Sequence, residues 1–143
     1  LTSFIPMLSG TGGNSGSQSS VAIIRALSLD EVEFSDMAAV VWKEVRVAVL
    51  CGACLAAANF VKMMVVDRWM MNNPDVTPAV ALVVCLTLFL TVICAKAVGC
   101  TLPMAAEKLG IDPAVMASPF ITTIVDALSL LIYFAIATQV LGI

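Results

Sequence analysis

The sequence predicts an all-α integral membrane helical bundle with four membrane-spanning helices. Hydrophobic residues make up 61% of the 143 residues and charged residues 12%, against about half and about a quarter in soluble domains. The mean hydropathy of +1.05 agrees with this. Several stretches are also long enough to cross the hydrocarbon core of a bilayer, which takes about 20 predominantly apolar residues. The expected spans cover approximately residues 1–28, 37–66, 76–106 and 113–142 of a single domain.

The same composition excludes several classes of function. The net charge of −3 and the isoelectric point near 4.6 give no basic surface for nucleic acid. The chain has no histidine, which removes the usual general base and the commonest metal ligand, so we do not expect an enzyme. Cys51 and Cys54 lack the further ligands that a zinc site needs. We expect the five cysteines to be buried hydrophobic residues.

The first expected span, residues 1–28, has a polar middle made of glycine, serine, threonine, asparagine and glutamine. Gly12 and Gly16 form a GxxxG pattern, which allows two membrane helices to approach closely. Asn14 and Gln18 are four residues apart and therefore place two amide side chains on one helix face. We expect a closely packed helix here rather than a flexible linker.

The second and third expected spans are more apolar and are joined by a short turn. Residues 37–66 follow a strongly charged connection, and their helix is predicted to start with Ser35 as its N-cap. Residues 76–106 contain the charge-free run 77–95. Lys96, just beyond that run, is expected to reach the membrane surface or to pair with an acid.

The basic residues give the orientation of the bundle. Five of the seven lie in or near the connections that follow the first and third spans: Arg25, Lys43, Arg46, Lys96 and Lys108. These two connections share one side of the membrane. The positive-inside rule assigns that side to the cytoplasm and both chain ends to the outside.

The fourth expected span, residues 113–142, contains a single carboxylate, Asp126, near its middle. A charged residue at mid-membrane costs about 2.5–3.5 kcal/mol on insertion scales and therefore faces a bundle interior or an aqueous path. Ser118, Thr122 and Asp126 are spaced by four residues and form one polar stripe, which Ser129 extends. An oxygen-rich surface with one charge suits a divalent ion that keeps most of its water, as Mg²⁺ does.

A free carbonyl would add to this surface. Pro119 cannot donate a hydrogen bond to the Val115 carbonyl, so that oxygen is expected to be free for water or an ion.

The carboxylate also has a second interpretation, in which Asp126 pairs with Lys96 or with serine hydroxyls and only fixes the helix register. The two interpretations differ in whether the carboxylate has a partner inside the bundle.

Two motifs resemble the MgtE family of magnesium channels. Residues 6–18, PMLSGTGGNSGSQ, followed by RAL at 25–27, are similar to the family's second membrane helix. Residues 109–119, LGIDPAVMASP, and 123–126, TIVD, are similar to the start of its fifth helix. The resemblance implies a five-helix membrane domain, of which this chain would hold the second to fifth helices. It also implies a homodimer in the lipid bilayer, with a pore at the two-fold axis lined by the second and fifth helices.

The resemblance further implies roles for single residues. Asp126 matches the family's pore carboxylate, which binds hydrated Mg²⁺. Thr122 and Ser118 match positions that present oxygens to the water shell of the ion, although the family usually has asparagine at the second. Gly10 and Asn14 match pore-facing positions. The full set expected to line the pore is Gly10, Gly13, Asn14, Gln18 and Ser129, and the set expected to pack helices is Gly12 and Gly16.

We therefore expect the chain to be a multi-pass protein of a prokaryotic inner membrane through which Mg²⁺ permeates as the transported ion. The family's first membrane helix, amino-terminal cytoplasmic domain and Mg²⁺-sensing CBS domains have no counterpart in these residues, so we expect a fragment. Two other functions stay open: a proton- or sodium-coupled cation carrier in which Asp126 titrates, and a membrane assembly module that transports nothing. Gating and the selectivity among Mg²⁺, Mn²⁺, Co²⁺ and Ca²⁺ also stay open.

Overall fold

The computed structural model describes residues 2–116 and 118–142, with the backbone alone for Ser118, and this part of the chain contains helices and no strand. The four long helices are α1 (Ile5–Ser28), α2 (Met37–Lys62), α3 (Pro78–Lys108) and α4 (Ser118–Leu141). Short 3₁₀ turns are η1 (Thr2–Phe4), η2 (Phe34–Asp36) and η4 (Pro113–Met116), while η3 (Met63–Met70) is a π-helix that continues α2. The predicted all-α bundle is confirmed.

Within the described residues, three helical segments are long and apolar enough to cross a membrane: Phe34–Met70, Pro78–Lys108 and Pro119–Leu141. Helix α1 has sufficient length but is not among them, because its glycines and serines lower its hydropathy. The first expected span is thus confirmed as a helix, and its passage through the membrane stays a prediction.

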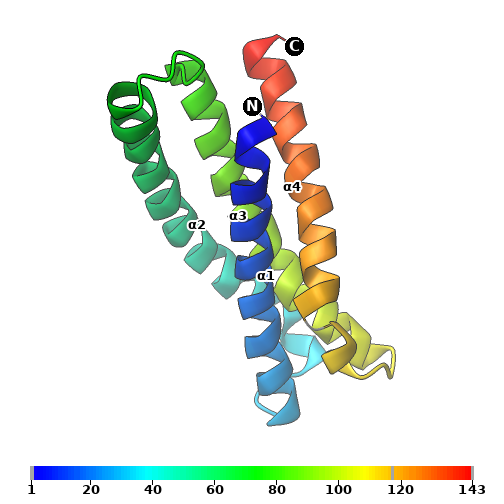
Figure 1. The fold of residues 1–143 in the computed structure, drawn as a ribbon. Coiled ribbons are helices and arrows are strands. Elements are labelled where there is room, and N and C mark those ends of the chain that lie inside the picture. The colour runs from blue at the N-terminus through cyan, green and yellow to red at the C-terminus, as the bar shows by residue number, and fades with distance from the viewer. Residues whose placement is uncertain (1, 117, 143) are drawn as a thin grey trace.

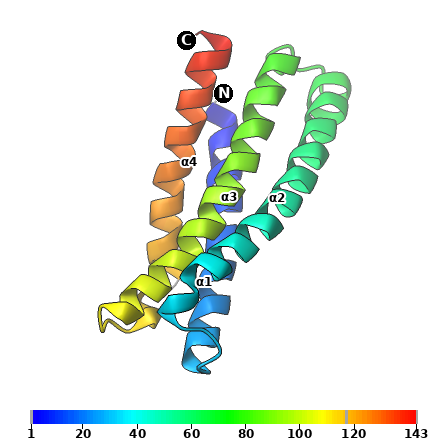
Figure 2. The same ribbon diagram turned by 180° about the vertical axis from the view of Figure 1, so that it is seen from behind.

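The helices are arranged around α3, which packs against each of the other three (Figure 1). Both chain ends and the α2–α3 turn lie at one end of the bundle, and the connections that follow α1 and α3 lie at the other. Figure 2 shows from behind that α2 lies along α3 and leans away from α1 and α4. This arrangement agrees with the predicted alternation of connections between the two sides of the membrane.

The ends of α3 follow from its local sequence. The Thr77 hydroxyl oxygen accepts a hydrogen bond from the Val80 N–H at 3.2 Å, which caps the first turn, and Pro78 follows at a position where no donor is needed. After Lys108 the chain leaves the helix through Gly110 at φ +73°, a left-handed conformation that glycine adopts without strain. Gly110 thus allows the chain to turn away from α3 directly after the helix ends.

The start of α2 differs from the prediction. Ser35 is not the N-cap but lies inside the 3₁₀ turn η2, and α2 begins at Met37. The turn is held by a capping box, in which the Glu33 N–H donates to Asp36 Oδ2 at 3.0 Å. This bond is stronger than a neutral one because its acceptor is a charged carboxylate, and Ser35 takes no part in it.

The start of α4 also differs. The segment from Pro113 to Met116 is a separate 3₁₀ turn, and Pro119 lies in the first turn of α4 rather than in a helix interior. Proline fits there because the N–H groups of a first turn have no carbonyl partner within the helix, so the missing N–H of proline costs no hydrogen bond. Pro119 therefore lies at a helix start, and the expectation that the Val115 carbonyl is free for water or an ion stays a prediction. The proline inside a helix is instead Pro103 of α3.

The exposure of the cysteines shows that other helices cover little of the surface of α2. Cys51 and Cys54, expected to be buried, are exposed on α2, whereas Cys85 and Cys100 of α3 are buried. The difference arises because α2 packs mainly along α3, while α3 is enclosed by three helices.

The closest approach in the bundle is between α1 and α3. A methyl group added at Gly99 would overlap the carbonyl oxygen of Gly16, so the two backbones are in direct contact. One turn earlier on α1, a methyl group at Gly12 would lie 2.6 Å from Thr91 Cγ2 of α3. Both positions therefore require glycine for α1 to lie this near α3.

Replacing Gly99 with alanine is expected to destabilise the bundle by about 1–3 kcal/mol, because the methyl group would overlap backbone that cannot move alone. Gly10→Ala is the matched control, since nothing lies within 4 Å of a methyl group there. Thermal unfolding in detergent, followed by circular dichroism, measures both variants. Equal midpoints would contradict the direct contact of α1 with α3.

Candidate metal-ion site

Asp126 lies near the middle of α4 and is half-buried against α1. A methyl group at Gly13 of α1 would lie 3.1 Å from Thr122 Cγ2 and 3.7 Å from Asp126 Oδ1. The absence of a side chain at Gly13 thus allows the backbone of α1 to lie beside the carboxylate. The structure brings together three of the residues predicted from sequence: Gly13, Thr122 and Asp126.

The Asp126 carboxylate has no hydrogen-bond or ion-pair partner among residues 2–116 and 118–142. Lys96, the partner considered from sequence, pairs with Glu44 instead. The Ser129 hydroxyl donates to the main-chain oxygen of Asp126 at 2.8 Å and not to its carboxylate. The alternative in which Asp126 pairs with Lys96 or with serine hydroxyls is therefore wrong for the described residues.

The first two turns of α4 supply further oxygen atoms. The hydroxyls of Thr122 and Thr123 both donate to the Pro119 carbonyl, at 3.0 and 2.9 Å. Because each hydroxyl uses its hydrogen within the helix, its oxygen can act only as an acceptor toward a ligand. Ser118, also predicted for this site, lies outside the described side chains.

The remaining predicted residues of α1 follow its exposed side. Gly10, Asn14 and Gln18 are exposed and spaced by four residues, so they form one face that adjoins Gly13. Gly12 and Gly16 lie on the opposite side of Gly13 and pack against Val125 of α4.

Ser129 does not belong to this exposed face. Its side chain is buried, with 1% of its surface exposed, and its hydroxyl lies 3.3 Å from the hydroxyl of Ser9 on α1. This serine pair connects α1 to α4 one turn away from Asp126. The structure thus places Ser129 in the interior, behind the carboxylate.

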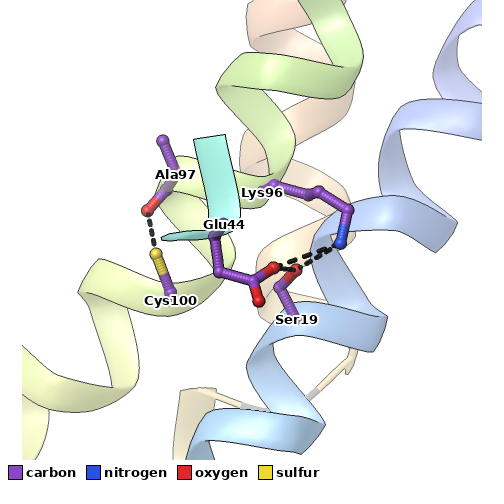
Figure 3. A network of polar contacts seen from close by, with 5 residues as sticks. All are labelled: Ser19, Glu44, Lys96, Ala97 and Cys100. Carbon is purple, nitrogen blue, oxygen red and sulfur yellow. Dashed lines mark hydrogen bonds and ion pairs between the residues drawn. The ribbon is translucent and has the colours of Figure 1, made fainter. Parts of the chain in front are cut away.

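A largely buried ion pair between Glu44 and Lys96, together with Ser19, joins α1, α2 and α3 (Figure 3). Lys96 Nζ of α3 lies 3.1 Å from Glu44 Oε2 of α2 and 3.1 Å from Ser19 Oγ of α1. The Ser19 hydroxyl donates to Glu44 Oε2 at 2.7 Å. The two charged side chains are only 14% and 19% exposed. The pair neutralises both charges within the bundle, and so Asp126 keeps an uncompensated charge.

An acid was expected from the sequence as one possible partner of Lys96, but neither Glu44 nor Ser19 was expected in particular. A signal was present, because Glu44 is the only acid in the 26 residues of α2. An adjacent serine, Ser20, donates to the Met116 carbonyl at 2.9 Å and so attaches η4, which precedes α4, to α1. Neighbouring serines of α1 thus hold α2 with α3 on one side and η4 on the other.

The described residues contain no group of three or more acidic, cysteine or histidine side chains that could hold a metal ion. This region of the chain therefore offers a single carboxylate with neighbouring oxygen atoms. Such a set is too small to replace the water shell of a divalent cation, but it can bind the outer surface of that shell.

These features define the class of the molecule: an integral membrane helical bundle with an unpaired carboxylate in α4 beside a polar helix. Residues 5–136 match the family model of MgtE, which is described as a divalent cation transporter, and the chain belongs to this family. The family membership expected from the two motifs is confirmed.

Individual relatives agree with the family match. The chain is 37% identical over 138 residues to the magnesium transporter MgtE of Bacillus subtilis, covering 96% of this chain and 29% of that protein. It is 37% identical over 141 residues to the magnesium transporter MgtE of Thermus thermophilus, covering 99% of this chain and 29% of that protein. The corresponding protein of Enterococcus faecalis is 34% identical over 139 residues. The chain spans less than a third of the length of these relatives.

Replacing Lys96 with methionine is expected to destabilise the bundle by about 3 kcal/mol, because the charge of Glu44 would then be buried without a counter-ion. Lys62→Met is the matched control. Its pair with Asp67 is shorter, at 2.8 Å, but the lysine is 53% exposed, so the loss should stay below about 1 kcal/mol.

The reversed pair, Glu44→Lys with Lys96→Glu, restores opposite charges and should recover part of the lost stability. Thermal unfolding in detergent measures all three proteins. If Lys62→Met lowered the midpoint as much as Lys96→Met, burial would not be what makes the three-helix contact important.

Proposed function

We propose that this chain forms the ion-conducting part of a magnesium transporter in the inner membrane of a prokaryote. In this proposal Mg²⁺ passes through a pore at the two-fold axis of a homodimer, and Asp126 binds the hydrated ion. The single observation that carries the proposal is the unpaired carboxylate of Asp126 in a membrane-spanning helix. Such residues are expensive in a membrane and mark ion pathways. Membership of a divalent cation transporter family supports the same function.

The chemistry of the site favours an ion that stays hydrated. Mg²⁺ gives up its water reluctantly and is usually held through one or two carboxylates. One protomer supplies one carboxylate, and a second copy of the chain across a two-fold axis would supply another. The negative charge would also exclude anions from the path. No further cofactor takes part in the proposal.

The proposed lining follows the exposed side of the α1–α4 contact. It consists of Gly10, Gly13, Asn14 and Gln18 from α1 with Thr122 and Asp126 from α4. Ser118 completes the predicted set at the start of α4. Ser129 is left out of the lining because its hydroxyl is buried and bonded within the protomer. Gly12 and Gly16 act as packing positions on the interior side.

Replacing Asp126 with asparagine keeps the size of the side chain and removes its charge, so Mg²⁺ flux should fall about tenfold or more. Flux into proteoliposomes that contain a Mg²⁺-sensitive dye measures this. Asp30→Asn is the matched control: Asp30 is exposed, lies far along the chain from α4, and has φ +54°, a conformation that asparagine tolerates. Its flux should be unchanged.

Three results would contradict the proposal in different ways. Normal flux in Asp126→Asn would remove the carboxylate from the path. Flux that depends on an imposed proton or sodium gradient would identify a coupled carrier. Absence of flux in a correctly folded protein, with loss of dimer on substitution of Gly12 or Gly16, would favour an assembly module.

A further inference from the structure

A cavity of about 480 Å³ lies at the α2–α3 turn, and none of its lining residues belongs to the candidate metal-ion site. Its wall is formed by the π-helix η3, the turn that follows, and Thr77 at the start of α3. π-Helical turns are rare and occur frequently at functional sites. The proposed transport function makes no use of this cavity.

The wall of the cavity carries an uncompensated positive charge. Arg68 has one long hydrogen bond within the described residues, from Nη1 to the Val76 carbonyl at 3.5 Å, and no ion pair there. The neighbouring acid, Asp67, is bound to Lys62 at 2.8 Å. Most of the guanidinium donors of Arg68 thus have no partner in the described part of the chain.

The polar neighbours of Arg68 in the wall also present donors. Asn73 Oδ1 accepts from the Asp75 N–H at 3.0 Å, and the Thr77 hydroxyl oxygen accepts from the Val80 N–H at 3.2 Å. The turn therefore occupies their acceptor atoms. The Asn73 amide hydrogens and the Thr77 hydroxyl hydrogen have no partner among the described residues. A cavity with spare donors and a positive charge is complementary to an anion rich in acceptor oxygens.

The position of the cavity at the membrane surface suggests the source of that anion. One apolar span ends at Met70 and the next begins at Pro78, so the turn between them lies where the chain leaves the hydrocarbon region. Trp69, which lines the cavity, is 79% exposed, as is typical of aromatic residues at the level of the lipid head groups. Phospholipid phosphates are concentrated at this level.

We propose that this cavity binds the phosphate of an anionic phospholipid head group. The Arg68 guanidinium donates to the phosphate oxygens as a planar fork, and Asn73 and Thr77 donate from the side of the turn. Trp69 and Met64 contact the glycerol and the first carbons of the acyl chains. A lipid bound there would stabilise the α2–α3 turn through contacts on the surface of the bundle.

The test measures lipid binding by native mass spectrometry of the protein released from neutral detergent. The probe is dioctanoyl phosphatidylglycerol, and dioctanoylglycerol, which has the same chains without phosphate, is the control ligand. Arg68→Gln should raise the dissociation constant of the phospholipid about tenfold or more. Arg68→Lys keeps the charge and loses the fork, so its effect should be smaller. Arg25→Gln, at the opposite end of the bundle, is the matched control and should change nothing.

Several results would overturn the proposal. Equal binding of dioctanoylglycerol would show that phosphate is not recognised. Equal weakening by Arg25→Gln would show general attraction to charge. Competition by inorganic phosphate at the same concentration would assign the cavity to free phosphate rather than to lipid.

A second measurement leaves Arg68 unchanged. The chain has two tryptophans, so Trp42→Phe makes Trp69 the only fluorescent indole. A phospholipid with a spin label on its head group should quench Trp69, and unlabelled phosphatidylglycerol should reverse the quenching. Quenching that unlabelled lipid does not reverse would also overturn the proposal.

Discussion

The polar composition of α1 is the constraint on which the rest of the bundle depends. A helix rich in glycine and serine gains little from contact with lipid, so protein contacts have to hold it in place. Glycines supply one part, because α3 reaches the backbone of α1 where Gly16 meets Gly99. Serine hydroxyls supply the other, through Ser9 with Ser129 and Ser19 with Glu44 and Lys96. These contacts act together with the buried side chains of Leu8, Ile23 and Leu27 to determine where α1 lies.

The same contacts explain why one carboxylate is left without a partner. Val125 of α4 packs against Gly12 and Gly16 on the α3 side of α1. The next residue, Asp126, therefore lies on the other side of that contact, beside Gly13. The only lysine of α3 within its apolar part is held by Glu44 and Ser19 and is not directed to α4. Packing and charge pairing thus act together to leave Asp126 without a partner among the described residues.

Much of the fold could be predicted from the sequence, because long apolar runs and helix stops such as Gly110 are local signals. The spacing of Thr122 and Asp126 likewise predicted one polar stripe on α4. Partners between helices were harder to find. Gly99 is a single glycine in an apolar run, and only the folded chain places it against Gly16. Glu44 and Lys96 are 52 residues apart, and Ser129 shares the period of Asp126 but faces inward. The spacing of residues in the sequence shows which of them share a helix face, but it does not show which other helix packs on that face.

The three-helix contact of Ser19, Glu44 and Lys96 has a consequence for the biosynthesis of the protein. Ser19 and Lys96 are separated by 77 residues, which ribosomes need about 4–15 s to synthesise at about 5–20 residues per second. During that interval α1 has left the ribosome while the helix that will enclose its glycines and serines does not yet exist. Until then the glycines and serines of α1 have no α3 to pack against. The contacts that hold α1 in its final position can form only after α3 has been synthesised. The order in which the helices pack therefore differs from the order in which they are made.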